Sequence, residues 1–451
     1  MTEAKKQYAA KGGQVLMGGL RVPGDKSISH RAVMLGALAR GRTEINGFLA
    51  GADALSTCEI FRAMGVTIDG PVDGHLVVHG VGVKGLRAPA GVLDCGNAGT
   101  AMRLIAGVMA GQPFASELTG DASLQRRPMR RVIAPLTAMG AKIDSRDGLP
   151  PLRITPAGGL HGIHYDMPVA SAQVKSAILL AGLFASGETR VTEPAPTRDH
   201  TERMLAAFGV TVQREGAAVR IAGGQPLTAT RIDVPADVSS AAFFMVAASI
   251  TPGSDIILEH VGINPTRIGI LHILTAMGAD ITLLEQGLAG DEPVADIRVR
   301  HAPLHGITID PAWVPLAIDE FPVVFVAAAC ATGRTVLTGA EELRVKESDR
   351  IAVMAQGLQA LGVQASATAD GMIIEGVGEA RPAFTGGRVD SHGDHRIAMA
   401  FAVASLRASD TILIDDTRNV ATSFPGFTDC CARLGLTVLE VDTDAADPAH
   451  G

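Results

Sequence analysis

LTAMGAKI, residues 136–143, joins the tail of a helix to the start of a strand through a single glycine. Glycine at this place suits the left-handed turn that ends many helices. The phrase recurs along the chain at intervals of about 70 residues, as FRAMGVTI (61–68), LTAMGAKI (136–143), LAAFGVTV (205–212), LTAMGADI (274–281), LQALGVQA (358–365) and CARLGLTV (431–438). Such self-similarity predicts an architecture of repeated units.

A second phrase lies between successive copies of the first, and it is an apolar helix that runs into a short strand. Its copies begin at residues 27, 97, 171, 239, 320 and 395. These helices are apolar on nearly all sides, which is typical of helices buried in a core. After each glycine-strand comes a turn and one more strand, as in DGHLVVHG at 73–80. The unit reads helix, strand, helix, strand, turn, strand, and it predicts an α/β fold.

Six such units predict two domains of three units each. We expect the first domain to span 22–235 and the second to comprise 1–21 together with 236–451. The crossovers would then fall near Pro23–Gly24 and near 235–237. A fragment of residues 22–235 should therefore fold alone.

The sixth unit ends at 438–441 without a closing strand. A segment close to the N-terminus, roughly 14–21, is our candidate for that missing strand. If it pairs there, the chain begins and ends in the same domain.

Composition narrows the functional class. The chain has 451 residues, which suits two domains, and 47% of them are hydrophobic. The net charge of −8 disfavours a nucleic-acid-binding protein, which usually carries a basic excess. No apolar run is long enough to span a membrane, and the N-terminus lacks the pattern of a signal peptide. The five cysteines show no metal-binding spacing, so we expect free thiols and a cytoplasmic location.

Polar clusters at the helix starts point to anion binding. Helix N-termini offer unpaired N–H groups and a partial positive charge. A cation in a first turn opposes the helix dipole by roughly 0.3–1 kcal/mol. Such cations nevertheless recur, as Lys26, Arg31, Arg103, Lys175 and Arg396. A shared site for several anions explains the recurrence, because guanidinium groups donate paired hydrogen bonds to phosphate and carboxylate.

Each motif also has a structural interpretation when it is taken alone. KESDR (346–350) could be a solvated helix face with an ordinary i,i+3 ion pair. Ser171 and Asp319 could be helix caps. GDHR (393–396) beside His392 could suggest a metal, but no further ligand accompanies it, and we expect no metal site. The occurrence of all these motifs at equivalent places of one repeat favours the functional interpretation.

The motifs VPGDKSISHR (22–31), GNAGTAMR (96–103), SAQVKSA (171–177), LRVKESDR (343–350) and GDHRIAMAF (393–401) occur in this order. Together they resemble the 5-enolpyruvylshikimate-3-phosphate synthase family over essentially the whole chain. The resemblance implies a two-domain inside-out α/β barrel of six βαβαββ units, the enolpyruvyl transferase fold, with the active site in the cleft between the domains. It also implies transfer of the enolpyruvyl group of phosphoenolpyruvate to the 5-hydroxyl of shikimate 3-phosphate, on the shikimate pathway to aromatic amino acids. Phosphate would leave by addition and elimination through a tetrahedral intermediate, without a cofactor.

The resemblance also implies roles for matching positions. Shikimate 3-phosphate would be bound by Lys26, Ser27, Arg31, Ser171, Ala172, Gln173, Arg198, Asp319 and Lys346. Phosphoenolpyruvate would be bound by Lys26, Asn97, Gly99, Thr100, Arg127, Gln173, Arg350 and Arg396. The catalytic set would be Asp319 as acceptor of the hydroxyl proton, Glu347 as donor to the methylene carbon, and Lys26. Glu342 and Thr422 depart from the better-known form of the family, so no role is carried over to them.

The short strings GDKS (24–27), SAQVK (171–175), RDHTE (198–202) and NPTR (264–267) resemble the second class of the family, which includes glyphosate-tolerant enzymes. The strongly tolerant form has alanine where this chain has Gly99. We therefore expect glyphosate to inhibit competitively, with at most partial tolerance. Because the binding cations are divided between the domains, we also expect substrate to draw the domains together. A site made within one chain leads us to expect a monomer.

Two other functions stay open at this stage. A UDP-N-acetylglucosamine enolpyruvyl transferase would share the fold, but that family usually carries a Lys-Asn pair and a loop cysteine. Here the pair is Lys26-Ser27, and residues 111–131 contain no cysteine. A non-catalytic anion-binding protein could use the same repeat, although Asp319 and Glu347 disfavour it.

Overall fold

The computed structural model describes residues 5–13 and 15–443, and the chain divides into two compact units. The continuous unit comprises Gly24–Pro235 and Leu288–Pro293. The split unit comprises Met1–Pro23, Ala236–Gly287 and Val294–Gly451. The divisions after Pro23 and Pro235 lie within two residues of the boundaries expected from the sequence. The short segment 288–293 was not anticipated.

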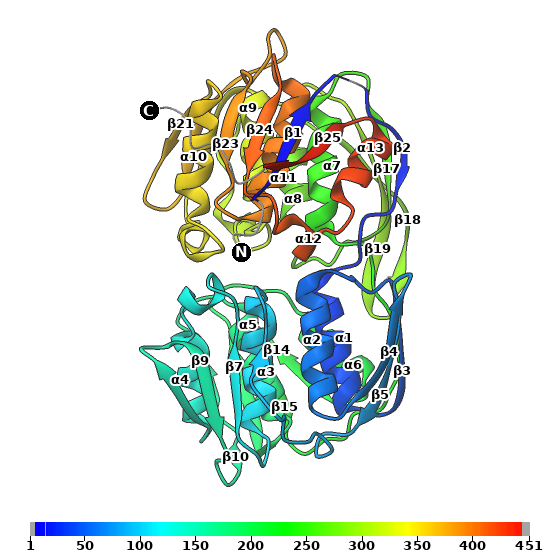
Figure 1. The fold of residues 1–451 in the computed structure, drawn as a ribbon, viewed down its shortest axis with the longest axis vertical. Coiled ribbons are helices and arrows are strands. Elements are labelled where there is room, and N and C mark those ends of the chain that lie inside the picture. Colours follow the sequence, from blue (N-terminus) through cyan, green and yellow to red (C-terminus); the bar gives the residue numbers. More distant parts are fainter. Residues whose placement is uncertain (1–4, 14, 444–451) are drawn as a thin grey trace. The chain divides into compact units, whose positions relative to one another are not determined.

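The continuous unit is built from three similar sheets, one additional two-stranded sheet and six α-helices (Figure 1). Its helices are α1 (Lys26–Leu38), α2 (Ala52–Ala63), α3 (Gly99–Ala110), α4 (Arg130–Ala138), α5 (Ala172–Gly182) and α6 (His200–Ala207), with a 3₁₀ turn η1 (Leu124–Arg126). Its strands are β3 (Arg40–Asn46), β4 (Thr67–Val72), β5 (His75–Val81), β6 (Leu93–Asp94), β7 (Ser116–Thr119), β8 (Lys142–Arg146), β9 (Leu149–Thr155), β10 (Leu160–His161), β11 (His164–Asp166), β12 (Ala185–Ser186), β13 (Glu188–Thr192), β14 (Val212–Glu215), β15 (Ala218–Ala222) and β16 (Arg231–Asp233).

One strand order recurs in the three sheets, in which a parallel pair is followed by two antiparallel strands. The orders are β16-β3-β5-β4, β6-β7-β9-β8 and β11-β13-β15-β14. The last strand, β16, pairs in parallel with β3, with Ile232 opposite Ile45. The final strand, which follows the third repeat in sequence, therefore belongs to the sheet of the first repeat. This pairing links the third repeat back to the first.

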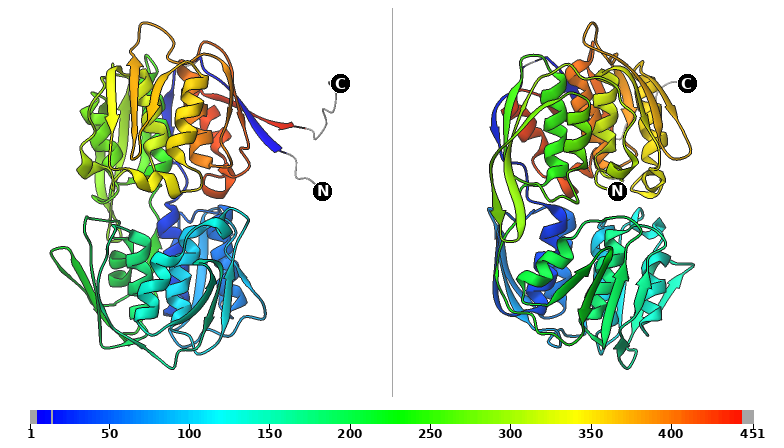
Figure 2. Two further views of the ribbon diagram at one scale, coloured as in Figure 1. Left: turned by 90° about the vertical axis from the view of Figure 1, so that its left-hand side faces the viewer. Right: turned by 180° about the vertical axis from the view of Figure 1, so that it is seen from behind.

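Helices α1, α3 and α5 form the core of this unit, and the sheets lie around them (Figure 2). Every residue of α1 from Ile28 to Leu38 is buried. Helices α3 and α5 pack so closely that a Cβ at Gly107 would meet the Ala177 carbonyl oxygen at 2.3 Å. The apolar sequence of these helices is thus explained by burial on all sides. In the described residues, no helix has the length and apolarity needed to cross a membrane.

The split unit repeats this plan with the sheets β18-β19-β17-β2, β20-β22-β21 and β23-β24-β1-β25. Its strands are β1 (Lys5–Lys11), β2 (Met17–Leu20), β17 (Asp255–Gly262), β18 (Asp280–Ala289), β19 (Glu292–Arg300), β20 (Thr332–Leu337), β21 (Gln364–Ala367), β22 (Met372–Val377), β23 (Gly387–Asp390), β24 (Ile412–Asp415) and β25 (Thr437–Thr443). Its helices are α7 (Val238–Ile250), α8 (Gly269–Ala276), α9 (Phe321–Cys330), α10 (Arg350–Ala360), α11 (His395–Ala404), α12 (Val420–Ser423) and α13 (Phe427–Leu434), with the 3₁₀ turns η2 (Pro311–Trp313), η3 (Glu341–Val345) and η4 (Ser405–Arg407).

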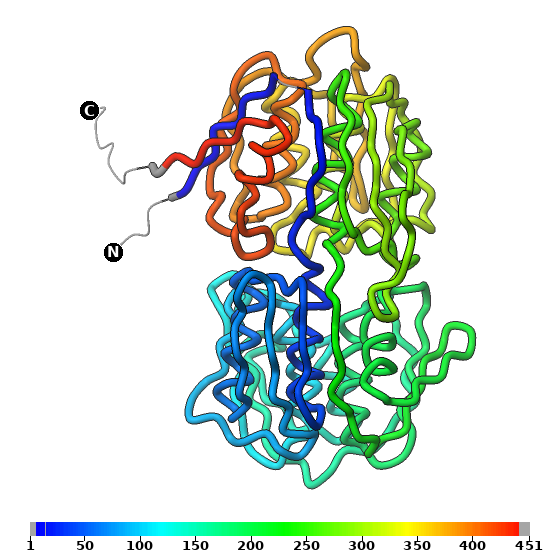
Figure 3. The backbone as a smooth tube through the Cα atoms, turned by 90° about the vertical axis from the view of Figure 1, so that its right-hand side faces the viewer, coloured from blue at the N-terminus to red at the C-terminus, as the bar shows by residue number. Residues whose placement is uncertain are grey.

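The closing strand of the sixth repeat is β1, and the prediction of residues 14–21 for this place is wrong. Strand β1 lies between β24 and β25, with Tyr8 opposite Ile414 and Glu440 (Figure 3). Its alternation buries Tyr8 and Ala10, and the Tyr8 ring stacks on Phe427 at 6.3 Å between centroids. The candidate segment instead contains β2, which pairs in parallel with β17 in the fourth repeat. Residue 14 of that segment lies outside the described residues.

The glycines of the repeated phrase occupy the conformation that the sequence predicts. All six have positive φ, namely Gly65 (87°), Gly140 (100°), Gly209 (88°), Gly278 (94°), Gly362 (83°) and Gly435 (105°). A side chain at these turns would be strained, so glycine recurs where each helix gives way to its strand. The prediction of six repeated βαβαββ units is confirmed.

Candidate active site

In the continuous unit, the start of α1 carries Lys26, Ser27 and Arg31. Asp25 caps this helix by accepting a hydrogen bond from the Ile28 N–H at 2.9 Å. The cap fixes the first turn, and the Lys26 ammonium reaches the buried Asp53 carboxylate at 3.1 Å. Asp53 lies on α2 and was not identified from the sequence. It limits where the Lys26 charge can lie.

Arg31 is buried, and its guanidinium donates hydrogen bonds to residues of the same unit. It donates to the Thr201 hydroxyl at 2.7 Å, to the Ser176 hydroxyl at 2.9 Å and to the Ser27 carbonyl oxygen at 2.9 Å. Burial lowers the pKa of Arg31 to about 10, and the neighbouring positive charge of Arg198 adds to the lowering while nearby carboxylates oppose it. Arg31 therefore joins α1, α5 and α6, and a second cation lies close to it.

His30, between these cations on α1, is held neutral. Burial lowers its pKa to about 3, and the charges of Lys26 and Arg31 lower it further. One ring nitrogen, Nδ1, lies 2.8 Å from the Thr57 hydroxyl. The start of α1 thus carries the cations Lys26 and Arg31 beside a neutral His30, and cations at a helix start favour an anion.

The start of α3 holds a second part of the predicted anion site. Its N-cap is Ala98, whose side chain has no group that can cap a helix. Arg127 donates to the Asn97 amide oxygen at 2.9 Å, and Asn97 in turn donates to Asp121 at 2.7 Å. A Cβ at Gly99 would meet the Arg103 and Arg127 guanidinium nitrogens at 2.9 and 3.0 Å. Two arginines therefore converge on the backbone of this first turn.

Gln173 connects α5 to α3. Its amide oxygen accepts from Arg103 at 2.8 Å, and its amide nitrogen donates to the Thr100 hydroxyl at 2.8 Å. Ser171 caps α5 through the Val174 N–H at 3.4 Å, and Ala172 begins the helix. The structure thus brings the starts of the two helices together, as the sequence predicts for one binding site. Arg103, a first-turn cation of the predicted anion site that was assigned to neither substrate, belongs to this group.

Lys175 does not belong to the anion site, although the sequence grouped it with the first-turn cations. Its side chain is fully buried, and its ammonium contacts Glu193 at 2.6 Å and Glu202 at 2.7 Å. A helix start carries residues on both its faces, and spacing alone did not show which face Lys175 occupies.

In the split unit, Asp319, Lys346, Glu347 and Arg350 lie together. Asp319 precedes α9, and Arg350 is the first residue of α10. The Arg350 guanidinium contacts Asp319 at 3.4 Å and Glu347 at 2.7 Å. The Lys346 ammonium lies 3.4 Å from the same Asp319 oxygen. The two carboxylates predicted to move protons are therefore neighbours of one cation.

Asp394, the N-cap of α11, fixes Arg350 from behind. It accepts from Arg350 Nε at 2.8 Å and from Nη2 at 3.3 Å, and it is fully buried. Burial alone would lower the pKa of Arg350, but Asp394, Glu347 and Asp319 raise it well above its usual value. Arg350 is only 1% exposed, so KESDR is not a solvated helix face. Asp394 stands in GDHR, and the sequence did not show its link to Arg350.

Arg396, on α11, reaches the same region. It donates to the Asp319 carbonyl oxygen at 3.1 Å and lies 3.8 Å from the buried Glu320 carboxylate. Glu320 also accepts from the Ser239 hydroxyl, which accepts in turn from Arg267 at 2.7 Å. Arg396 and Asp319 are therefore held to a common buried network.

Glu342 and Thr422 have local contacts. Glu342 lies 3.9 Å from the Lys346 ammonium and is partly exposed. The Thr422 hydroxyl donates to the Asn419 carbonyl oxygen at 2.6 Å within the turn around α12.

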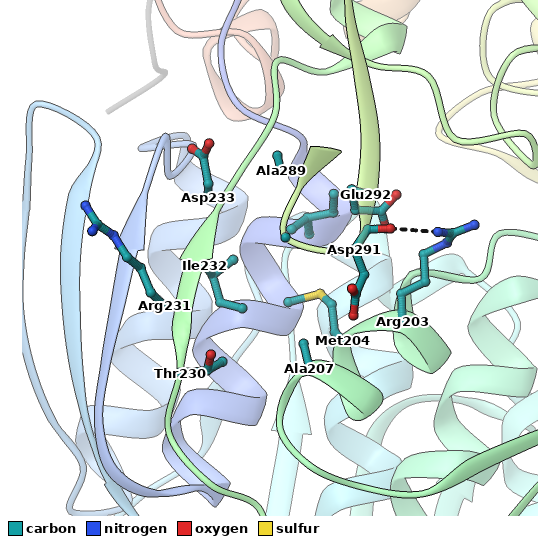
Figure 4. A pocket seen from close by; sticks show the side chains of 12 residues that line it. Arg203, Met204, Ala207, Thr230, Arg231, Ile232, Asp233, Ala289, Asp291 and Glu292 are labelled. Carbon is teal, nitrogen blue, oxygen red and sulfur yellow. Dashed lines mark hydrogen bonds between the residues drawn. The ribbon is translucent and has the colours of Figure 1, made fainter. Parts of the chain in front are cut away.

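A cavity of about 220 Å³ lies in the continuous unit beside α6 and β16 (Figure 4). The segment 289–292 forms one wall, and Arg203 donates to the Asp291 carbonyl oxygen at 2.7 Å. Its lining contains none of the site residues predicted above, all of which the structure describes. Over residues 5–13 and 15–443, no group of three or more His, Cys, Asp or Glu side chains could hold a metal ion.

Comparison with known proteins gives one consistent family. The model of the family "EPSP synthase (3-phosphoshikimate 1-carboxyvinyltransferase)" matches residues 10–430. A 3-phosphoshikimate 1-carboxyvinyltransferase of Alkalilimnicola ehrlichii is 63% identical over 439 residues, covering 97% of this chain and 98% of the relative. One of Methylococcus capsulatus is 62% identical over 432 residues, covering 96% and 98%. A solved structure of EPSP synthase from Acinetobacter baumannii is 56% identical, with a TM-score of 0.88 and coverage of 97% of this chain and 100% of that chain.

Proposed function

We propose roles for the residues of both units from one premise, which is that the chain belongs to the EPSP synthase (3-phosphoshikimate 1-carboxyvinyltransferase) family. The chain is a transferase that moves the enolpyruvyl group of phosphoenolpyruvate to shikimate 3-phosphate on the shikimate pathway. The alternative acceptor UDP-N-acetylglucosamine is not favoured, and neither is a role without catalysis.

Two groups of residues suit the anionic charges of phosphoenolpyruvate. The first lies at the start of α3 in the continuous unit and comprises Arg127, Asn97, Gly99, Thr100 and Gln173. Arg350 and Arg396 lie beside Asp319 in the split unit. We assign both groups, together with Lys26, to phosphoenolpyruvate, so that both units contribute to one active site. Preorganised guanidinium groups stabilise the charge that develops as phosphate leaves.

Shikimate 3-phosphate would take the remaining groups. Its phosphate would meet Ser171, Ala172 and Arg198, and the cations of α1 would add positive potential. Ser27 and Arg31 lie on α1 beside this group, although Arg31 acts mainly through its bonds to Thr201 and Ser176. Asp319 and Lys346 would face the 5-hydroxyl.

The proton transfers would be divided between two carboxylates. Asp319 accepts the 5-hydroxyl proton as the oxygen attacks C2 of phosphoenolpyruvate, and Glu347 protonates C3, giving a tetrahedral adduct. As phosphate leaves the adduct, the Glu347 carboxylate takes back a proton from the methyl group. The observation that carries this assignment is the contact of Asp319 and Glu347 with the one guanidinium of Arg350. Because one cation contacts both, the group that would accept the hydroxyl proton and the group that would protonate C3 are held close together.

The assignment of Glu347 can be tested by running the reaction in D₂O. Protonation of C3 followed by loss of a methyl proton places deuterium in the methylene group of the product. Glu347→Gln should reduce turnover by roughly 10²–10⁴-fold and suppress deuterium exchange into unreacted phosphoenolpyruvate. Glu341→Gln, an exposed neighbour on η3, is the matched control. Normal exchange in the Glu347 variant would assign the protonation to another group.

Because the cations are divided between the units, we also propose that substrate binding draws the units together. The radius of gyration from small-angle scattering should fall when shikimate 3-phosphate and glyphosate are both saturating. An unchanged radius of gyration would contradict the proposal that substrate draws the units together. Competitive inhibition by glyphosate, a monomeric state and a cytoplasmic location belong to the same proposal.

A further inference from the structure

A buried ion cluster lies directly beneath the proposed phosphate-binding residues of the continuous unit. Lys175 follows Ser171, Ala172 and Gln173 on α5, and its side chain is fully buried. Its ammonium contacts Glu193 Oε1 at 2.6 Å and Glu202 Oε1 at 2.7 Å, with the Thr197 carbonyl oxygen at 3.5 Å. The three ammonium protons thus have three acceptors.

The second oxygen of Glu193 holds the loop that precedes α6. Glu193 Oε2 accepts from the Thr197 N–H at 2.8 Å and from the Thr197 hydroxyl at 2.5 Å. The intervening residues 194–196 are Pro, Ala and Pro. The carboxylate therefore closes a short proline-restricted loop, and Arg198 is the next residue along the chain.

Stability alone is a weak reason for such a cluster. Taking charges out of water opposes most of the Coulomb attraction, and apolar residues of similar volume often stabilise as well or better. A carboxylate with two occupied oxygens does provide direction, because it fixes the Thr197 backbone relative to α5. The cluster thus relates two segments that would contact the same phosphate, namely Ser171–Gln173 and Arg198.

We infer that Glu193 is a positioning residue for shikimate 3-phosphate, because it ties Thr197, and through it Arg198, to the helix that carries Lys175 and the Ser171 cap. The inference rests on the proposed function, since it concerns the phosphate site of that substrate. Arg198 must meet a phosphate whose oxygens accept at fixed directions. A loop held in place before binding loses less freedom when the phosphate arrives.

Two kinds of variant separate positioning from stability. Thr197→Val removes the hydroxyl bond and leaves the contacts of Lys175 with Glu193 and Glu202 intact. Thr197→Ser restores a hydroxyl at the same place. Glu193→Gln removes the carboxylate itself and leaves Lys175 with Glu202. Glu188→Gln is the matched control, because Glu188 begins β13, the strand that ends directly before Glu193, and is exposed to solvent.

For each variant, the dissociation constant of shikimate 3-phosphate is measured by titration, together with the KM of both substrates, kcat and the melting temperature. Thr197→Val and Glu193→Gln should weaken shikimate 3-phosphate binding by about tenfold or more, while the KM of phosphoenolpyruvate stays within about twofold. Thr197→Ser and Glu188→Gln should bind as the unchanged chain does.

If Thr197→Val binds shikimate 3-phosphate normally, or if both KM values rise together, the cluster is structural and the inference is wrong. If Glu193→Gln fails to fold, Thr197→Val and Thr197→Ser still decide the question. Absence of turnover in the unchanged chain would instead overturn the proposed function. The titration measures binding of shikimate 3-phosphate without turnover, so the two failures can be told apart.

Discussion

Asp319 and Glu347 lie at two ends of a single guanidinium, with Arg350 Nη1 3.4 Å from Asp319 Oδ1 and Nη2 2.7 Å from Glu347 Oε2. The shared cation fixes the separation of the two carboxylates that would accept and donate protons in the proposed mechanism. It can do so because Asp394 holds its other edge and because the side chain is buried.

Asp394→Asn should disturb the reaction without removing any group proposed to touch substrate. The amide keeps one acceptor but loses the charge that balances Arg350. A charge-assisted hydrogen bond contributes roughly 1.5–3 kcal/mol, so we expect kcat/KM for phosphoenolpyruvate to fall about 10- to 150-fold. Steady-state kinetics measure the change.

Asp390→Asn is the control for this prediction, because Asp390 is an exposed aspartate on β23, shortly before Asp394. It should leave kcat/KM nearly unchanged. Equal kinetics for the two variants would show that Arg350 keeps its place without Asp394.

The buried His30 makes stability depend on pH. Its pKa falls from 6.5 to about 3 on folding, so the neutral form is favoured in the native state. The stabilisation is complete above the unfolded pKa and is lost as pH falls from 6.5 towards 3. At pH 5 the loss is about 2 kcal/mol of the free energy of unfolding.

His30→Asn keeps a hydrogen-bonding group near Thr57 but does not titrate. Chemical denaturation at pH 7 and pH 5 should therefore show a smaller fall in stability for this variant than for the unchanged chain. His75→Asn, at an exposed position, should behave as the unchanged chain does. The same pH dependence in all three proteins would mean that His30 is protonated in the native state at pH 5.

Gly99→Ala probes the space between α3 and two arginines. The added Cβ would meet Arg103 at 2.9 Å and Arg127 at 3.0 Å, so both guanidinium groups must shift. We expect the glyphosate inhibition constant to rise by about tenfold or more, with a smaller rise in the KM of phosphoenolpyruvate, because overpacking typically costs about 1–3 kcal/mol.

Gly91→Ala is the matched control, since a Cβ there meets no atom within 4 Å. Its inhibition constant should equal that of the unchanged chain. An unaltered constant in Gly99→Ala would place glyphosate away from the start of α3.

Much of the fold could be predicted from one repeated phrase. Each helix of that phrase ends at a residue with positive φ, and glycine adopts this conformation most readily, so the same glycine recurs in every copy. The closing strand was harder to identify. Both β1 and β2 are short segments near the N-terminus, and only the pairing partners β24, β25 and β17 distinguish them. Strand pairing over such distances depends on side-chain packing that a local pattern does not contain.

In the candidate site too, local sequence features could be predicted and contacts between distant elements could not. First-turn cations could be identified by their unfavourable place in the helix dipole, and Arg103 and Arg396 contact other predicted residues, as does Arg350. Their counterions could not be identified, because Asp53 and Asp394 come from other elements. Lys175 obeys the same sequence pattern but points into the core.

A fragment of residues 22–235 should fold by itself. All the buried residues of its hydrophobic core lie between Ile28 and Val234. The fragment lacks Glu292, which lies 2.7 Å from His200, so its melting temperature should be lower than that of the unit in the whole chain. Circular dichroism and amide NMR dispersion test this, and an unfolded fragment would show that 288–293 is needed for folding.

The measurement that tests the central claim most directly is phosphate release from phosphoenolpyruvate, with shikimate 3-phosphate or UDP-N-acetylglucosamine as acceptor. The unchanged chain and Asp319→Asn are compared, with the exposed Asp310→Asn as control. We predict release with shikimate 3-phosphate alone, a fall of roughly 10²–10⁴-fold in Asp319→Asn and full activity in the control. Release with UDP-N-acetylglucosamine, or undiminished release in Asp319→Asn, would contradict the account.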